Sequence, residues 1–159
     1  VLDADGLRLA ARDPSVLQCG ASLVITPHPG EMAALSGLSV EEVQAAREEI
    51  AAEFASRRKV IVVLKGFRTV ISDGTRVETN LTGNPGMASA GSGDVLAGIV
   101  GSLLAQGYPA WESAVTGVYL HGLAGDFARR TFGEEAMTAS DIIGGLPGAF
   151  RFLKQGRRP

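Results

Sequence analysis

Residues 60–64 constrain the fold more than any other segment, because five apolar residues that favour strands stand in a row there. A strand without polar alternation must be covered on both faces, as in parallel sheets that lie between helices. A second apolar run, Leu23-Val24-Ile25, lies within an expected strand at residues 22–26, and segments with helical spacing separate the two runs. We therefore predict an α/β fold with a parallel sheet.

The other segments alternate in the same way. A short strand is expected at residues 1–3, and the Asp73-Gly74 step predicts a hairpin between strands 69–72 and 76–79, since both turn residues tolerate positive φ. Ser39 and Glu42 form a capping box for one helix that reaches about residue 57. Its polar face, which we interpret as solvated, carries Glu41, Arg47, Glu48 and Glu49. Further helices are expected at residues 5–12, 31–35, 93–106 and 109–131, and after Thr138, where Pro147 should kink or end the last helix.

Composition and charge narrow the class of protein. The 159 residues fit one domain, and 45% apolar residues allow a sizeable core. A net charge of −2 argues against a nucleic-acid binder, and no apolar run is long enough to span a membrane. Cys19 is the only cysteine and has no visible base or metal partner, so we interpret it as inert and expect a reducing, cytoplasmic location.

The strongest chemical signal is Gly91-Ser92-Gly93-Asp94, which stands directly before an apolar helix. Glycines let the backbone approach a ligand closely, and the unpaired amides of a first helical turn suit a phosphate group. Asp94 could then accept a proton from a substrate hydroxyl while the amides hold the transferred group. A glycine-rich loop with a helix-capping aspartate explains the four residues equally well. The segment matches neither a Walker loop nor a dinucleotide fingerprint.

Polar residues also follow the expected strands. His28 and Glu31 lie in a proline-stiffened loop after one strand, Lys65-Gly66 ends the next, and Asp3 and Asp5 follow the first. Loops at the carboxyl ends of parallel strands meet at one sheet edge, where α/β folds bind ligands. The residues alone therefore predict an α/β enzyme that handles a phosphorylated or nucleotide ligand. His121 lies mid-helix among glycines and is interpreted as a packed or interface residue.

Five segments occur in an order that resembles the NAD(P)H-hydrate dehydratase family of the ribokinase-like superfamily. They are Asp3-Ala4-Asp5-Gly6-Leu7, Thr26-Pro27-His28-Pro29-Gly30-Glu31-Met32, Lys65-Gly66-Phe67-Arg68-Thr69, Asn84-Pro85-Gly86-Met87-Ala88 and Gly91-Ser92-Gly93-Asp94-Val95-Leu96-Ala97-Gly98. The similarity covers nearly the whole chain, to about residue 153. The His-Pro-Gly-Glu and Asn-Pro-Gly-Met segments are fairly specific to this family, whereas Gly-Ser-Gly-Asp is shared with many ribokinase-like kinases.

The resemblance implies a repair reaction. Members of the family remove water from hydrated, inactive NADH or NADPH by phosphorylating the hydroxyl and eliminating phosphate, with ADP or ATP as the donor and magnesium beside the nucleotide. ADP is the usual donor in bacterial-type members, and AMP is then the product. Family members are commonly tetramers, so a homo-oligomer is expected. The implied fold is a three-layer αβα ribokinase-like sandwich with a mostly parallel sheet.

The same resemblance assigns roles to individual residues. Asp94 is expected to be the catalytic base, and the amides of Gly91, Ser92 and Gly93 form the anion hole. The nucleotide is expected to contact Lys65, Gly66, Phe67, Arg68, Thr69 and Gly93. Substrate binding is assigned to His28, Gly30, Glu31, Asn84, Asp94 and Asp5, and no dedicated metal ligands are visible.

Two departures leave alternatives open. Ala90 replaces a glycine found in many relatives, a change that we expect to be tolerated. The family domain begins well before a position like Val1, so residues 1–159 are interpreted as the carboxy-terminal portion of a single domain whose amino-terminal strands are missing. A ribokinase-like kinase of a vitamin precursor would use the same Asp94, and a nucleotide-binding fragment without activity of its own is the third possibility.

Overall fold

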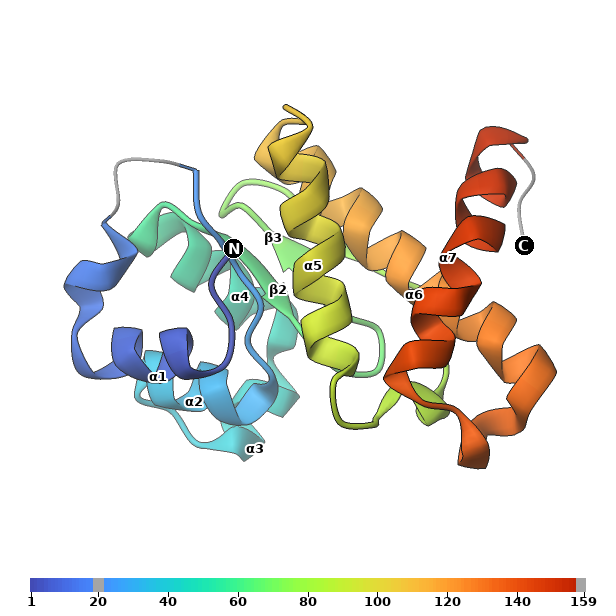
Figure 1. The fold of residues 1–159 in the computed structure, drawn as a ribbon. Coiled ribbons are helices and arrows are strands. Elements are labelled where there is room, and N and C mark those ends of the chain that lie inside the picture. Colours follow the sequence, from blue (N-terminus) through green and yellow to red (C-terminus); the bar gives the residue numbers. More distant parts are fainter. Residues whose placement is uncertain (19–21, 157–159) are drawn as a thin grey trace.

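The computed structural model describes residues 1–18 and 22–156 and places a small sheet among helices (Figure 1). Its strands are β1 (Val24–Ile25), β2 (Ile61–Leu64), β3 (Val70–Ser72) and β4 (Val77–Thr79). The α-helices are α1 (Asp5–Arg12), α2 (Pro29–Ser36), α3 (Val40–Ala45), α4 (Arg47–Arg58), α5 (Ser92–Ala105), α6 (Ala110–Ala136) and α7 (Ala139–Lys154), with short 3-10 helices η1 (Pro14–Leu17) and η2 (Pro85–Met87). Cys19 lies outside the described residues, so its interpretation stays a prediction.

The strand order is β1-β2-β3-β4. β1 and β2 are parallel, with Val24 opposite Ile61, while the two following pairs are antiparallel. Leu2 forms an isolated parallel bridge to Ile25 in place of the strand expected at residues 1–3. The α/β class is confirmed, but the sheet of the described residues is mixed rather than mostly parallel. The hairpin at Asp73-Gly74 explains the difference, because it adds two antiparallel strands.

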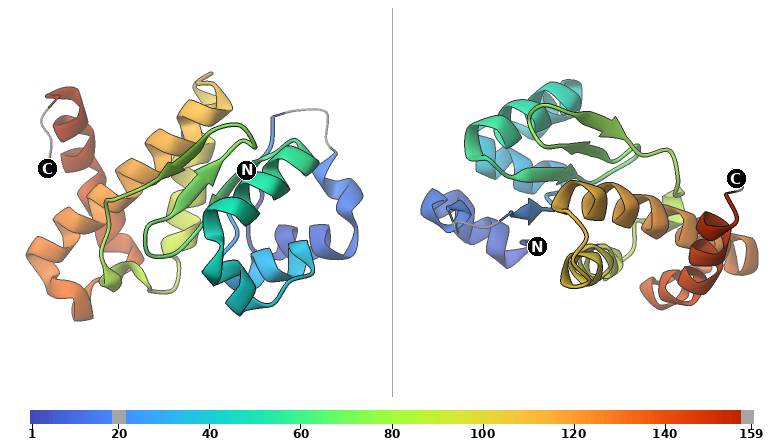
Figure 2. Two further views of the ribbon diagram at one scale, coloured as in Figure 1. Left: turned by 180° about the vertical axis from the view of Figure 1, so that it is seen from behind. Right: turned by 90° about the horizontal axis from the view of Figure 1, so that it is seen from above.

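The two faces of the sheet pack against different helices (Figure 2). Ile25, Val62, Leu64 and Val70 are buried in one cluster with residues of α1, α2 and α4. Val24, Ile61, Val63 and Ile71 are buried in another with residues of α5 and α6. Fully burying one such side chain contributes about 1.5–3 kcal/mol. The expected three-layer αβα arrangement is therefore confirmed, and it explains the continuous apolar runs.

The single helix expected between Ser39 and residue 57 is wrong, because the chain leaves the helical conformation at Ala46, with φ −136° and ψ 47°. Apolar spacing cannot reveal such a break, since one non-helical residue leaves the buried positions Val43 and Phe54 on the same side. Arg47 directly follows the break, and its side chain does not lie on the solvated face assigned to it: its Nη2 donates to the carbonyl of Leu64 at 2.9 Å.

The last helix does not end at Pro147, because α7 continues to Lys154. A proline inside a helix removes one backbone hydrogen bond. Burial of Ile142 and Ala149 against α6 on either side of Pro147 offsets that loss. α6 itself contains Gly133 in a non-helical conformation, with φ 76° and ψ 172°, close to the end expected at residue 131.

We predict that Gly74→Ala lowers the free energy of unfolding by about 2–4 kcal/mol, since it combines backbone strain with a steric clash. Gly74 has φ +89°, and an added Cβ would lie 2.5 Å from the backbone of Ser56. Gly107→Ala is the matched control, because Gly107 has φ +86° but no atom within 4 Å of its added Cβ. Urea unfolding of both variants measures the difference, and equal losses would contradict the clash.

Candidate active site

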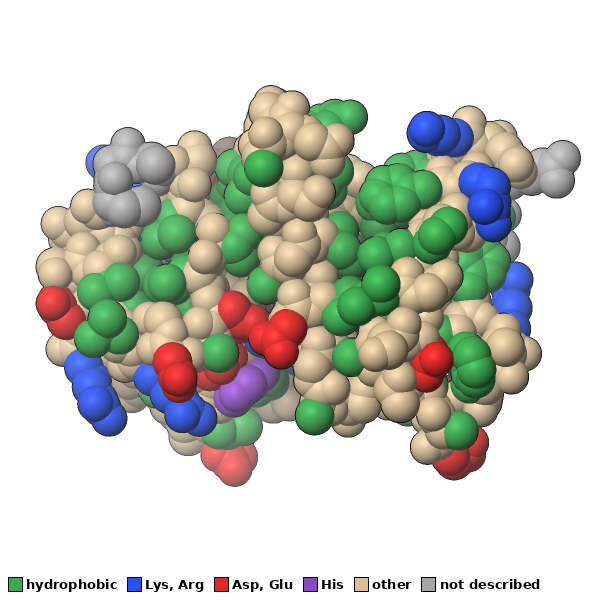
Figure 3. All heavy atoms as spheres, viewed as in Figure 1, with side chains coloured by type: hydrophobic (Ala, Val, Ile, Leu, Met, Phe, Trp, Pro, Cys, Tyr) green, Lys and Arg blue, Asp and Glu red, His purple; other side chains and the backbone are tan. Residues whose placement is uncertain are grey.

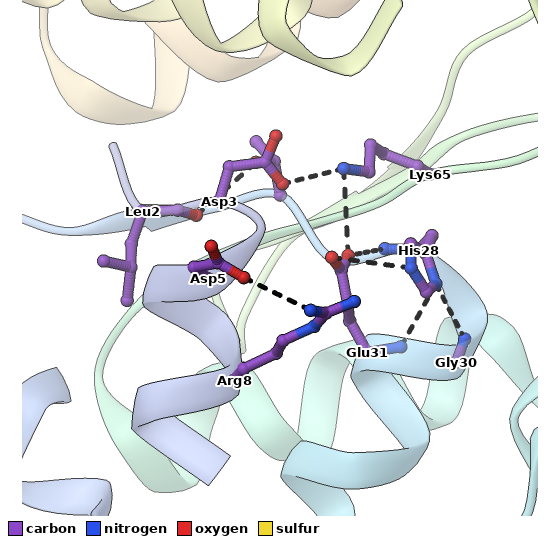
Figure 4. Close-up of polar contacts among 9 residues, drawn as sticks. Leu2, Asp3, Asp5, Arg8, His28, Gly30, Glu31 and Lys65 are labelled. Carbon is purple, nitrogen blue, oxygen red and sulfur yellow. Dashed lines mark hydrogen bonds and ion pairs between the residues drawn. The ribbon is translucent and has the colours of Figure 1, made fainter. Parts of the chain in front are cut away.

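Three chain segments that are distant in sequence meet at the carboxyl end of the parallel strands (Figure 4). The backbone N–H of Lys65, directly after β2, donates to the carbonyl of Pro27, which follows β1, at 2.8 Å. Thr26 N donates to the carbonyl of Leu2 at 3.2 Å, so Asp3 continues from the same edge. The convergence predicted from the sequence is thus present for Asp3, His28, Glu31 and Lys65.

Lys65 links these segments through its side chain. Its Nζ lies 2.7 Å from Asp3 Oδ1 and 3.8 Å from Glu31 Oε2. The three side chains are mostly buried, with exposed fractions of 20% for Lys65, 14% for Asp3 and 10% for Glu31. An ammonium group has three N–H donors, and among these contacts only that with Asp3 is a hydrogen bond, so this arrangement leaves capacity for a further acceptor, such as a phosphate oxygen.

His28 is held by the start of α2. Its Nδ1 accepts hydrogen bonds from the backbone N–H groups of Gly30 at 3.0 Å and Glu31 at 3.2 Å, while Glu31 Oε2 accepts from the N–H of His28 at 2.7 Å. Because Nδ1 is an acceptor twice, the proton of the neutral ring must sit on Nε2, which lies 3.4 Å from Glu31 Oε1. The hydrogen bonds of the helix cap hold this side chain in place, and the two prolines that flank it stiffen the loop. Glu31 faces inward and positions His28.

The first turn of α5 borders the same cluster. Gly91, with φ 85°, precedes the helix, and Gly93 faces the ion pair so closely that an added Cβ would lie 3.4 Å from Lys65 Nζ and 3.6 Å from Asp3 Oδ2. Asp94 is in this turn and exposed, and its side chain has no hydrogen bond or ion pair with the described residues. The helix amides and the lysine charge thus border the same small space, beside a free carboxylate.

His121 of α6 reaches the start of α5, a contact that the sequence interpretation missed. Its Nε2 lies 3.3 Å from the hydroxyl of Ser92, the first residue of that helix. Burial lowers the pKa of His121 to about 4; the hydrogen bond of Ser92 opposes this shift and the positive charge of Lys65 adds to it. The ring is therefore neutral at neutral pH. Glycines near His121 indicated close packing but could not indicate Ser92 as its neighbour.

Residues 65–69 leave β2 as an exposed turn. Phe67 is 87% exposed, Arg68 has φ 54°, and the hydroxyl of Thr69 donates to the carbonyl of Gly66 at 3.1 Å. The guanidinium of Arg68 stacks on the ring of Phe67, with Cζ 5.5 Å from the centroid. An exposed aromatic ring and a cation suit a planar base and its phosphates.

Two sequence-predicted residues stand apart from the cluster. Asp5 pairs with Arg8 across one turn of α1 at 3.3 Å, and its side chain is almost fully exposed. Asn84 Nδ2 donates to Asp126 Oδ1 of α6 at 3.1 Å, and the N–H of Gly83 donates to Asp126 Oδ2 at 3.0 Å. Asp126, which sequence reasoning did not select, thus clamps this loop onto α6. No hydrogen bond or ion pair among the described residues joins Asp5 or Asn84 to Lys65.

Charged side chains and one histidine gather on the face between α1, α2 and the start of α5 (Figure 3). Within residues 1–18 and 22–156, no three His, Cys, Asp or Glu side chains are grouped to hold a metal ion. In that same part of the chain, no helix is long and apolar enough to cross a membrane.

Comparisons with known proteins identify the family of this chain. The family model described as NAD(P)H-hydrate dehydratase matches residues 1–147. A ribokinase-like superfamily protein from Enterococcus faecalis has a TM-score of 0.74 and 33% identity over 99% of this chain and 53% of its own. The fold and the glycine-rich helix start thus define a ribokinase-like α/β protein. More narrowly, the match to the family model shows that the chain belongs to the NAD(P)H-hydrate dehydratase family.

Two named relatives illustrate the similarity. The chain is 49% identical over 158 residues to the bifunctional NAD(P)H-hydrate repair enzyme of Moorella thermoacetica, which covers 98% of this chain and 30% of the relative. The ADP/ATP-dependent NAD(P)H-hydrate dehydratase of Bacillus subtilis, co-crystallised with ATP and Mg²⁺, has a TM-score of 0.78 and 31% identity over 82% of this chain and 47% of its own. The chain therefore spans half or less of these two proteins. That residues 1–159 are the carboxy-terminal portion of one domain stays a prediction.

We predict that acid destabilises this protein through His121. The pKa of His121 is about 4 in the folded state, against an ordinary value of 6.5. Between these two pH values the unfolded chain therefore binds a proton that the folded chain does not. The contribution of the neutral ring is complete above pH 6.5 and is lost as the pH falls toward 4, by at most about 3 kcal/mol. Urea unfolding from pH 7 to 4 should show a shallower decline for His121→Asn than for the wild type. Parallel declines would show that His121 titrates normally.

Proposed function

We propose that this chain carries the phosphoryl-transfer site of a nucleotide-dependent NAD(P)H-hydrate dehydratase. The single observation that carries the proposal is the approach of Gly93, in the first turn of α5, to the Asp3–Lys65 pair. Amide donors and an ammonium group border one space, and the exposed carboxylate of Asp94 lies in the same helical turn. This combination suits transfer of a phosphoryl group to a hydroxyl.

In the proposed reaction, the hydroxyl oxygen of the hydrated nicotinamide ring attacks the terminal phosphorus of the nucleotide, and Asp94 accepts the proton of this hydroxyl. The bond to the leaving nucleoside phosphate breaks, so ADP yields AMP. The carbon–oxygen bond then breaks, phosphate leaves with the oxygen, and loss of a neighbouring ring proton restores the double bond. Of the three amides expected to form the anion hole, the N–H of Ser92 donates to the carbonyl of Ser89 at 3.3 Å. We therefore assign the stabilisation of the charge on the transferred group to the amides of Gly91 and Gly93, together with Lys65.

The other residues receive roles that fit their contacts. His28 offers its Nε2 proton as a donor to the hydrated cofactor, because its Nδ1 is occupied by backbone N–H groups. Residues 65–69 contact the nucleotide, supported by the exposed ring of Phe67 beside Arg68. Magnesium would arrive with the nucleotide phosphates, and the exposed oxygens of Asp94 are the donor type that it prefers. Asn84 and Asp5 stay predictions for substrate binding, as do the tetrameric assembly and the cytoplasmic location.

A kinase of a vitamin precursor would use the same groups and release a stable phosphorylated product. The match to dehydratases over residues 1–147 favours the dehydratase instead. The thiazole and pyrimidine alcohols that such a kinase would phosphorylate serve as a counter-test in the experiment below.

We expect the intact protein to restore the absorbance of reduced nicotinamide from hydrated NADPH or NADH in the presence of ADP, or ATP, and Mg²⁺. Asp94→Asn should lower kcat by about 10²–10⁴-fold, because the base is lost. Asp141→Asn is the matched control: Asp141 is also the third residue of a helix, α7, where its carboxylate accepts from the N–H of Thr138. The Asp141→Asn variant should retain the activity of the wild type. Phosphorylation of the alcohols without recovery of the cofactor would establish the kinase in place of the dehydratase.

A further inference from the structure

Arg47, the first residue of α4, binds the backbone at the point where β2 ends. Its Nη2 donates to the carbonyl of Leu64 at 2.9 Å and lies 3.4 Å from the carbonyl of Lys65, while Nη1 donates to Gln44 Oε1 at 3.1 Å. The side chain is half-buried, and burial lowers the pKa of its guanidinium. No carboxylate of the described residues pairs with it. Its positive charge is therefore offset only by carbonyl dipoles.

The guanidinium lies directly against Gly66. This glycine has φ +140°, and an added Cβ would lie 2.7 Å from Arg47 Nη1. Arg47 thus contacts the inner side of the turn formed by residues 65–69. The outer side of this turn stays open, and Phe67 is exposed there. Arg47 directly follows the break between α3 and α4 at Ala46, and its side chain contacts the end of β2 instead of lying on the solvated face.

We propose that Arg47 is a positioning residue for the nucleotide. By holding the carbonyls of Leu64 and Lys65, it fixes the direction in which Lys65 leaves the strand and the shape of the turn that follows. Its uncompensated charge also attracts phosphate from behind that turn, because a half-buried charge is screened less than an exposed one. The inference rests on the proposed function, since it takes residues 65–69 as the nucleotide-contacting segment.

A positioning role predicts a specific kinetic pattern. Nucleotide binding should weaken, while the chemical step at Asp94 and the binding of the hydrate at His28 should stay nearly unchanged. A merely structural role would instead lower the amount of active protein, which reduces the apparent kcat and leaves the KM for ADP unaltered.

The test compares three variants of the intact protein in titration calorimetry with ADP and Mg²⁺ and in steady-state turnover. Arg47→Met keeps the length but removes the donors, and should raise both the Kd and the KM for ADP about 10–100-fold, with kcat within about threefold. Arg47→Lys keeps the charge but not the planar pair of donor nitrogens that contacts Leu64 and Gln44 together, and should recover part of the affinity. Arg57→Met is the matched control on α4, because Arg57 is exposed and contacts Glu53 at 3.7 Å and the ring of Phe54, both on α4 itself. This variant should bind ADP as the wild type does.

Unchanged ADP binding in Arg47→Met, or a loss in kcat without a change in KM, would overturn the proposal. If Arg47→Met does not fold, wild-type affinity in a folded Arg47→Lys would overturn it as well, and reduced affinity would support it. Calorimetry with ADP does not depend on turnover of the hydrate. A wild type that binds ADP but does not turn over the hydrate would therefore refute the dehydratase, while the Arg47 comparison still gives its own answer.

Discussion

The ion pair between Lys65 and Asp3 is the interaction on which the site depends. It joins the end of β2 to a residue 62 positions earlier, at 2.7 Å, in a place where both side chains are largely removed from water. Removing one partner of such a pair leaves the other charge poorly solvated, so the two residues stabilise each other's position. The first turn of α5 packs over this pair, and α2 contributes Glu31 beneath it.

Around that pair, apolar packing on the faces of the sheet is separated from the polar groups at the strand ends. The apolar sides of β1, β2 and β3 are covered by α1, α2 and α4 on one face and by α5 and α6 on the other, whereas the edge strand β4 is largely exposed. The start of α2, the start of α5 and the end of β2 lie around one space. The helix itself does not pair the first N–H groups of α2, and His28 caps those of Gly30 and Glu31.

Much of this arrangement could be predicted from sequence. The apolar runs at residues 23–25 and 60–64 indicated buried strands, and the residues that follow them indicated the shared edge. The break at Ala46 could not be predicted, because it leaves the pattern of buried residues intact. The contact of Arg47 with the end of β2 depends on how α4 packs against the sheet, and the contact of His121 with Ser92 depends on how α6 packs against α5. Both contacts arise from tertiary packing and leave no pattern in the neighbouring sequence. The same holds for the hydrogen bonds by which Asp126 holds the loop at Asn84.

The glycine at position 93 has a consequence for how this protein balances folding against activity. A methyl group there would meet the lysine and the aspartate only at ordinary van der Waals distance, so the fold does not require glycine, in contrast to Gly74. Alanine in place of glycine inside a helix typically stabilises by up to about 1 kcal/mol. Glycine at this position therefore costs stability, and it leaves the helix surface opposite the ammonium without a methyl group. Designers who seek a more heat-resistant version by replacing helical glycines should leave this one in place.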